Sequence, residues 1–458
     1  MTAAAGERST GIWGPQYIWV TVGAVALIFL AAMQALAVTT VMPIVSADLA
    51  GETLYAVAFA GTLATGVIGM VAVGAWSDRS GPKAPLYAAV ALFVVGLVIA
   101  GLAPTMEVLV VGRLIQGLGA GGQTVALYVV VARVYPPEIH GRVFAAFSAA
   151  WVVPSLVGPF LAGAVTEYLH WRWVFLGVAV LTVLAFTMVA LRLHGFPLHT
   201  EEPSGGHVAA RLACALAVAV GALALSLAGE LGAWSALAVA ASVVVIAFAA
   251  RPLLPPRTLR SARGLPSVIL MRGLIAGALF GAEIYVPYLL IAEYGFSPTW
   301  AGLGLTAAAL LWAAAADVQG RFGDLIGNAR ITLLGTALLS TALIVAATTA
   351  WAQLHPATLV AGWTLAGAGM GLMYPRLTVL TLAYSTPQNQ GFNSSALSIS
   401  DSIGASVAIA VMGLAFTALI ATDAGFTVVF AIAAALSLLA LVPGLRLGHA
   451  REANPAQR

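Results

Sequence analysis

The sequence predicts an all-α integral membrane protein with two six-helix bundles and two extra helices between them. Hydrophobic residues make up 61% of the 458 residues and charged residues only 8%, whereas a soluble domain carries about 25% charged residues. The apolar segments are long and lack the period-two alternation of a membrane β-barrel, which favours helices. Short motifs also recur at about half the chain length, and such recurrence indicates an internal duplication.

Fourteen segments are long and apolar enough to cross a bilayer as helices, which takes about 20 residues each. We expect them near residues 17–45, 55–76, 84–103, 107–131, 142–167, 172–193, 210–229, 233–250, 267–292, 298–318, 329–350, 356–382, 392–420 and 425–445. The first is too long for a signal-peptide core and is interpreted as a retained helix.

These segments predict a domain organisation around the inserted pair of helices. A cytoplasmic N-terminus (1–16) precedes an N-terminal six-helix bundle (17–193). Two inserted helices with flanking cytoplasmic loops (194–266) lead to a C-terminal six-helix bundle (267–445) and a cytoplasmic tail (446–458).

The placement of basic residues predicts the orientation. With the N-terminus inside, nearly all arginines fall on or near the cytoplasmic side, with Arg172 as the clear exception. We therefore expect a multi-pass plasma (inner) membrane protein, monomeric, with both termini in the cytoplasm. The net charge of +3 reflects this bias and indicates no nucleic-acid partner, and the single cysteine, Cys214, excludes a disulfide framework. No cofactor or metal is expected.

A ten-residue motif occurs twice, each time in a polar turn between apolar segments. The first copy contains Gly74, Asp78, Arg79, Gly81 and Lys83, and the second contains Gly320, Asp324, Gly327 and Arg330, at an offset of 320 − 74 = 246 residues. A second registration, at an offset of 362 − 112 = 250, aligns the glycines of 112–121 with those of 362–371. The glycines permit tight turns. The charged groups predict either a cytoplasmic gating latch between the halves or a plain solvated turn.

Four motifs resemble those of the major facilitator superfamily. The first copy of the repeat resembles the loop 2–3 signature, and Arg113-x-x-Gln116-Gly117-x-Gly119 resembles the helix 4 motif. The segment with Pro154, Gly158, Pro159 and Gly163 resembles the helix 5 antiporter motif, with Ala162 in place of one glycine. Trp171-Arg172-Trp173-Val174-Phe175 resembles the start of helix 6 in drug exporters. The resemblance covers essentially the whole chain and, with fourteen helices, implies the drug:proton antiporter branch.

The antiporter motif has few polar groups, so we expect it to act through packing. Small residues let helices approach closely, and Pro154 and Pro159 bend the helix. In the superfamily this helix lies at the interface between the halves and is thought to block leakage.

Two carboxyl groups inside predicted helices are candidates for proton coupling. Glu283 lies about 16 Å deep at 1.5 Å per residue, where a charge costs roughly 2.5–3.5 kcal/mol and burial favours the neutral acid. Asp401, in the cytoplasmic third of its segment, is a second proton or substrate candidate. The alternatives are a structural acid hydrogen-bonded to a neighbouring helix for Glu283 and a polar contact near water for Asp401.

Other residues are candidates for substrate binding or charge balance. Arg113 either meets a carboxylate or anionic group or forms a structural ion pair. Gln34 occupies the position where the antiporter branch often has an acid, nine residues before Pro43, and is expected to be a pore-facing hydrogen-bonding residue. The aromatic residues Trp151, Trp363 and Tyr285 either line an apolar substrate cavity or pack against helices and lipid.

The function predicted is secondary active export of small, hydrophobic or amphiphilic compounds in exchange for protons by alternating access, of the multidrug type. A facilitator or importer of a small metabolite on the same fold, or a membrane scaffold or sensor, are the alternatives. An enzyme is not expected, because the sequence has no His-Glu-x-x-His metal site and no Gly-x-x-x-x-Gly-Lys phosphate loop.

Overall fold

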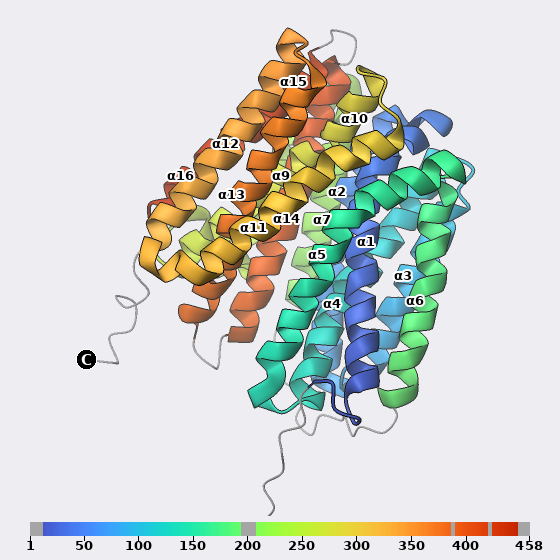
Figure 1. The fold of residues 1–458 in the computed structure, drawn as a ribbon, viewed down its shortest axis with the longest axis vertical. Coiled ribbons are helices and arrows are strands. Elements are labelled where there is room, and N and C mark those ends of the chain that lie inside the picture. The colour runs from blue at the N-terminus through green and yellow to red at the C-terminus, as the bar shows by residue number, and fades with distance from the viewer. Residues whose placement is uncertain (1–11, 194–207, 386–389, 420–423, 448–458) are drawn as a thin grey trace, which may run out of the picture.

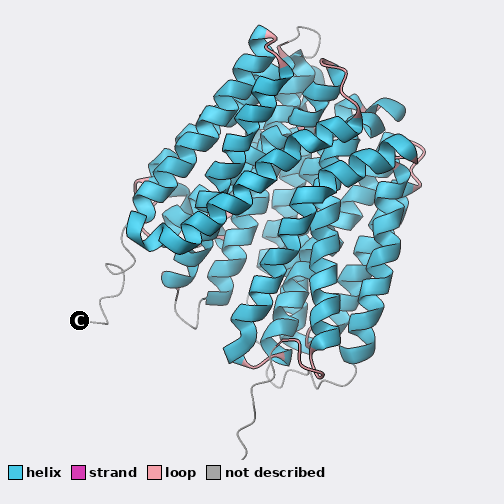
Figure 2. Cartoon of the chain, in the orientation of Figure 1, coloured by secondary structure: helices cyan, strands magenta, loops and turns pink. Residues whose placement is uncertain are grey.

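The computed structural model describes residues 12–193, 208–385, 390–419 and 424–447 (Figure 1). These ranges contain helices joined by short loops and no strand (Figure 2), which confirms the all-α prediction. Twelve helices are long and apolar enough to span a membrane, and a bent pair within 149–168 makes a thirteenth candidate. Helix α13 (Pro356–Ala383) has 28 residues but is not among them. The chain is therefore a multi-pass membrane protein, and the count of fourteen spans stays a prediction.

The N-terminal half consists of α1 to α6. Their bounds are α1 Ile18–Asp48, α2 Tyr55–Ser80, α3 Lys83–Gly101, α4 Met106–Val134, α5 Pro137–Tyr168 and α6 Arg172–Leu193. Helix α4 packs against α2 and α3, while α1 packs against α5 and α6.

The C-terminal half consists of α9 to α16. Their bounds are α9 Leu265–Glu283, α10 Tyr285–Ala292, α11 Pro298–Ile326, α12 Asn328–Ala352, α13 Pro356–Ala383, α14 Gln390–Leu419, α15 Gly425–Leu439 and α16 Leu441–Gly444. Helix α13 packs against α11 and α12, just as α4 packs against α2 and α3. The two halves therefore share a packing scheme.

The duplication extends to individual glycine contacts. A Cβ on Gly117 of α4 would lie 2.2 Å from the carbonyl oxygen of Thr62, and one on Gly367 of α13 would lie 1.9 Å from that of Ala308. The same holds one turn later, where Gly121 meets Gly66 at 2.0 Å and Gly371 meets Trp312 at 2.2 Å. These backbones touch, so only glycine fits at the four positions.

The repeated turn has the same conformation in both halves. Helix α2 ends at Ser80 and α11 at Ile326, and each is followed by a glycine with positive φ, 80° at Gly81 and 89° at Gly327. Each glycine amide donates to a carbonyl four residues earlier at 3.0 Å. This left-handed conformation is unfavourable for other residues, which explains the recurrence of glycine.

The inserted helices lie beside the seam between the halves. They are α7 Val208–Ser226 and α8 Ser235–Ala249, joined by the 3-10 helix η2 Ala228–Trp234. Helix α7 packs against α2 of one half and α14 of the other, whereas α8 packs mainly on α7. In Figure 1, α7 lies near the centre of the molecule.

The halves meet where α5 crosses α11. A Cβ on Gly163 would lie 2.5 Å from the carbonyl oxygen of Pro298, and one on Gly302 would lie 2.3 Å from that of Pro159. Helix α5 bends by 43° between Ala149–Ser155 and Val157–Tyr168, because Pro159 has no amide to donate to the Ser155 carbonyl. We call this end of the bundle the far end, and the opposite end, where α1 begins and α16 finishes, the terminal end.

Candidate functional site

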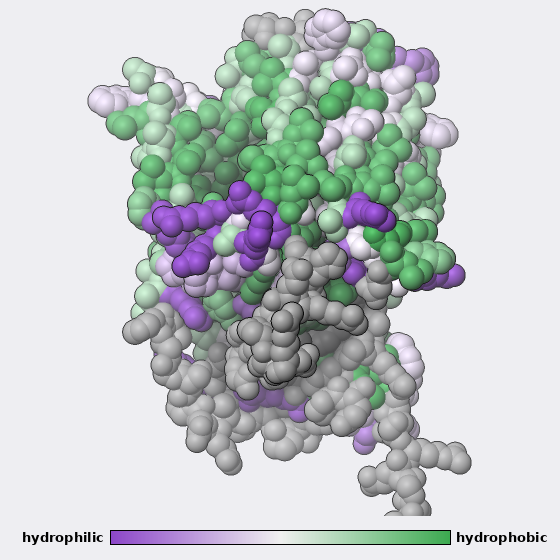
Figure 3. Space-filling view, turned by 90° about the vertical axis from the view of Figure 1, so that its left-hand side faces the viewer, coloured by the Kyte–Doolittle hydropathy of each residue, from purple (hydrophilic) through white to green (hydrophobic). Residues whose placement is uncertain are grey.

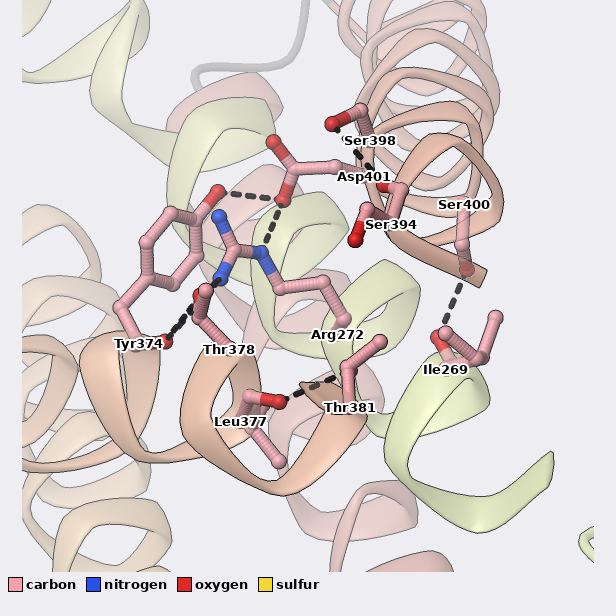
Figure 4. Close-up of polar contacts among 10 residues, drawn as sticks. All are labelled: Ile269, Arg272, Tyr374, Leu377, Thr378, Thr381, Ser394, Ser398, Ser400 and Asp401. Atoms are coloured by element: carbon pink, nitrogen blue, oxygen red, sulfur yellow. Dashed lines mark hydrogen bonds and ion pairs between the residues drawn. The ribbon is translucent and has the colours of Figure 1, made fainter. Parts of the chain in front are cut away.

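An ion pair inside the C-terminal half joins three helices (Figure 4). Nε of Arg272 on α9 donates to Oδ1 of Asp401 on α14 at 2.8 Å, and the hydroxyl of Tyr374 on α13 donates to the same oxygen. A second guanidinium nitrogen donates to the Tyr374 carbonyl at 3.1 Å and to the Thr378 hydroxyl at 3.4 Å. We call Arg272, Tyr374, Thr378 and Asp401 the polar cluster.

The polar cluster is partly accessible. The side chains of Arg272 and Asp401 are 12% and 25% exposed, and the guanidinium carbon lies 3.1 Å from the centroid of the Tyr374 ring. A buried charge needs such compensation, and the cation–π contact adds to it. The sequence predicted Asp401 as a site residue. Arg272 was predicted only as one of the many arginines on or near the cytoplasmic side.

Aromatic side chains surround the polar cluster. The Tyr374 ring lies 5.4 Å from that of Trp312 on α11 and 6.4 Å from that of Phe280 on α9. The cluster therefore combines flat apolar groups with one compensated charge pair.

Glu283 ends helix α9 at a break before α10. It follows Arg272 by 283 − 272 = 11 residues, three helical turns, and so lies on the same face about 16 Å along the axis. It is 18 residues from Leu265 and 9 from Ala292, so it lies nearer the far end than the terminal end. Its side chain is half-buried, and no described residue forms a hydrogen bond or ion pair with it.

Three hydrogen bonds join the halves at the far end. The Tyr55 hydroxyl donates to the carbonyl of Ile284 at 2.6 Å, directly after Glu283. Ser406 donates to the Ala60 carbonyl at 2.8 Å, and Thr299 donates to the Glu167 carboxylate at 2.5 Å. The far end is therefore closed by contacts that a separation of the halves breaks.

An aromatic cluster surrounds the Tyr55 bond. The ring of Tyr55 lies 5.8 Å from that of Tyr285 and 4.9 Å from that of Tyr288. Tyr285 is 1% exposed and also packs against Phe416 at 5.0 Å. Its burial reflects packing at the closed far end, and its predicted role in a substrate cavity stays a prediction.

The N-terminal half holds polar groups that are buried with few partners. Arg113 is 4% exposed and donates to Oε1 of Gln116 at 2.8 Å and to the Ala58 carbonyl at 3.3 Å. No carboxylate of the described residues forms an ion pair with it. Gln34 is fully buried, and neither amide atom has a hydrogen-bond partner among the residues that the structure describes.

The remaining predicted residues lie in different surroundings. Trp363 is 1% exposed in the C-terminal half, whereas Trp151 is 48% exposed. Arg79 is exposed and Lys83 partly so. The side chains of Asp78 and Asp324 lie outside what the structure describes, so the gating latch stays a prediction.

Two helical halves with a common packing scheme, joined at one end and enclosing polar groups, define a class of membrane transporter. The sequence profile of the Major Facilitator Superfamily matches residues 24–282 and again 268–458. The chain belongs to this superfamily.

Two relatives from Mycobacterium tuberculosis align with most of this chain. An uncharacterised MFS-type transporter of Mycobacterium tuberculosis (strain ATCC 25618 / H37Rv) is 29% identical over 398 residues, which cover 83% of this chain and 56% of the relative. The chain thus spans little more than half the length of that relative. A probable multidrug-efflux transporter of the same strain is 27% identical over 465 residues, with 96% and 97% covered.

Solved structures share the fold. A POT family transporter in complex with 5-aminolevulinic acid superposes with a TM-score of 0.70 at 13% identity, covering 96% of this chain and 99% of that one. A bacterial homolog of the human lysosomal transporter Spinster gives a TM-score of 0.66 at 16% identity, with 95% and 99% covered.

Proposed function

We propose that the protein is a proton-coupled exporter of small, hydrophobic or amphiphilic compounds that works by alternating access in the plasma membrane, with the terminal end in the cytoplasm. The observation that carries the proposal is the carboxyl group of Glu283, which is half-buried at the α9–α10 break and forms no hydrogen bond or ion pair with any described residue. It directly precedes Ile284, whose carbonyl accepts the inter-half bond from Tyr55.

This adjacency links a proton to closure of the far end. A neutral carboxylic acid costs less to bury than a carboxylate, so protonated Glu283 favours the closed arrangement. Loss of the proton places an uncompensated charge beside the Tyr55 contact and favours hydration and opening there. A proton gradient then biases which state is populated.

The polar cluster is the proposed substrate site. Asp401 already accepts hydrogen bonds from Arg272 and Tyr374, so it is less suited than Glu283 to exchange a proton in each cycle. The aromatic rings of Trp312, Tyr374 and Phe280 fit flat apolar ligands. The similarity to a probable multidrug-efflux transporter supports this substrate class.

The test is transport in proteoliposomes with an imposed pH gradient and ethidium as an amphiphilic probe. We expect Glu283→Gln to abolish gradient-driven ethidium accumulation, while the protein stays inserted and monodisperse. Glu230→Gln, at an exposed acid of η2, is the matched control and should transport normally. Gradient-driven accumulation by Glu283→Gln at the wild-type rate would refute the proton role, and downhill ethidium flux without gradient dependence in the wild type would favour a facilitator.

A further inference from the structure

A cluster of arginines at the terminal end is not used by the transport mechanism. Arg251, Arg257, Arg260 and Arg263 lie in the segment between α8 and α9, which contains the 3-10 helices η3 Arg251–Leu253 and η4 Thr258–Arg260. All four side chains are exposed. The sequence has no acidic residue from 251 to 282, and the two ion pairs seen among the described residues, Arg272–Asp401 and Arg321–Asp317, do not involve the four arginines.

The segment is held in one conformation by internal hydrogen bonds. The hydroxyl of Thr258 donates to the Pro255 carbonyl at 2.7 Å, and that of Ser267 donates to the Ala262 carbonyl at 2.8 Å. Arg446, which follows α16, donates to the Ser261 carbonyl at 3.0 Å, and its own carbonyl accepts from the Gly264 amide at 3.2 Å. A preorganised segment loses little conformational entropy when it binds a ligand.

Two residues of the segment adopt left-handed backbone angles, with φ of 65° at Arg257 and 50° at Ser261. Such angles are uncommon outside glycine and persist only where the surroundings fix them. They flank η4, which carries the exposed Arg260. The spacing of positive charges is thus a fixed feature of the fold.

Apolar side chains flank the arginines. Leu259 is 45% exposed, Leu445 is 68% exposed, and Phe248 is 60% exposed with the Arg251 guanidinium 4.2 Å from its ring centroid. Figure 3 shows hydrophilic residues gathered in a band below a broad apolar surface. This combination, guanidinium groups beside exposed apolar groups at the end of membrane-spanning helices, matches a ligand with an anionic head and acyl chains.

We propose that the segment from Arg251 to Arg263 binds the headgroup of an anionic phospholipid such as phosphatidylglycerol. Guanidinium groups recognise a phosphodiester through paired hydrogen bonds, and Leu259 and Leu445 contact the acyl chains. The contact with acyl chains distinguishes this ligand from free phosphate, which gains nothing from exposed leucines. The site would anchor the two inserted helices, of which α7 lies against both halves.

The test measures lipid binding to the full-length protein in neutral detergent by native mass spectrometry, with dioleoyl-phosphatidylglycerol and dioleoyl-phosphatidylcholine titrated separately. Each basic residue near an anionic membrane contributes about five-fold in affinity. We therefore expect the triple variant Arg257→Gln/Arg260→Gln/Arg263→Gln to bind phosphatidylglycerol about a hundred-fold more weakly, with phosphatidylcholine binding unchanged.

Matched variants separate a site from general positive charge. Arg79→Gln/Arg192→Gln/Arg330→Gln removes the same charge from exposed positions and should keep wild-type phosphatidylglycerol affinity. Leu259→Ser keeps every charge and the fold, and should weaken binding as well. The proposal would be overturned if both triple variants lost the same phosphatidylglycerol affinity, or if Arg257→Gln/Arg260→Gln/Arg263→Gln lost none. Displacement of the lipid by millimolar inorganic phosphate would overturn it as well.

Discussion

The clearest energetic prediction concerns the Arg272–Asp401 ion pair. Asp401→Asn keeps the shape of the side chain but removes its charge, which leaves the Arg272 guanidinium with the Tyr374 carbonyl and the Thr378 hydroxyl. Breaking a fully buried pair costs about 3–5 kcal/mol, and an exposed pair about 0–1 kcal/mol. With side chains 12% and 25% exposed, we expect a loss of about 2–3 kcal/mol in the free energy of unfolding.

The assay is unfolding in mixed micelles with increasing SDS, followed by tryptophan fluorescence. The chain provides a matched control, because Asp317 pairs with Arg321 at 2.9 Å but the two side chains are 55% and 70% exposed. Asp317→Asn should cost no more than about 1 kcal/mol. The double variant Arg272→Gln/Asp401→Asn should lose less than the sum of its single changes. Equal costs for Asp401→Asn and Asp317→Asn would refute the reasoning.

Three further predictions concern closure of the halves and the buried amide. Gly302→Ala places a Cβ 2.3 Å from a carbonyl of α5 and should open the far end, which spin labels on the two halves would report as longer distances. The control is Gly320→Ala, whose Cβ meets nothing within 4 Å and which should leave these distances unchanged. Tyr55→Phe removes one hydrogen bond and should shift the same equilibrium by about 0.5–1.5 kcal/mol; unchanged distances would contradict this. Gln34→Leu removes two unpartnered buried polar atoms and should not lower the unfolding free energy, and a loss above about 1 kcal/mol would mean that Gln34 has a partner.

Much of the scaffold follows from the sequence because it rests on local rules. Long apolar runs require helices in lipid, and the repeated glycines predicted tight turns. The structure has these turns at Gly81 and Gly327, and it adds close backbone contacts at the repeated glycines of α4 and α13. The prolines of the antiporter motif likewise predicted a bent helix, and the bend lies at that motif.

The site depended on contacts between distant segments, which the sequence does not reveal. Arg272 was counted among the basic residues that set orientation, yet it packs against α13 and α14 and pairs with Asp401. Its position on the same helical face as Glu283 was the available signal. Tyr55 belongs to no recognised motif, and its inter-half hydrogen bond is to the carbonyl of a residue 229 positions away along the chain.

The central claim is that Glu283 carries the exchanged proton, and proton release on ligand binding tests it most directly. The ligand is the amphiphilic dye that most stabilises the purified protein in a thermal-shift screen, added in weakly buffered detergent with a pH indicator. We predict proton release from the wild type and from Asp401→Asn wherever the dye still binds, and none from Glu283→Gln at saturating dye. Release of as many protons by Glu283→Gln as by the wild type would contradict the account.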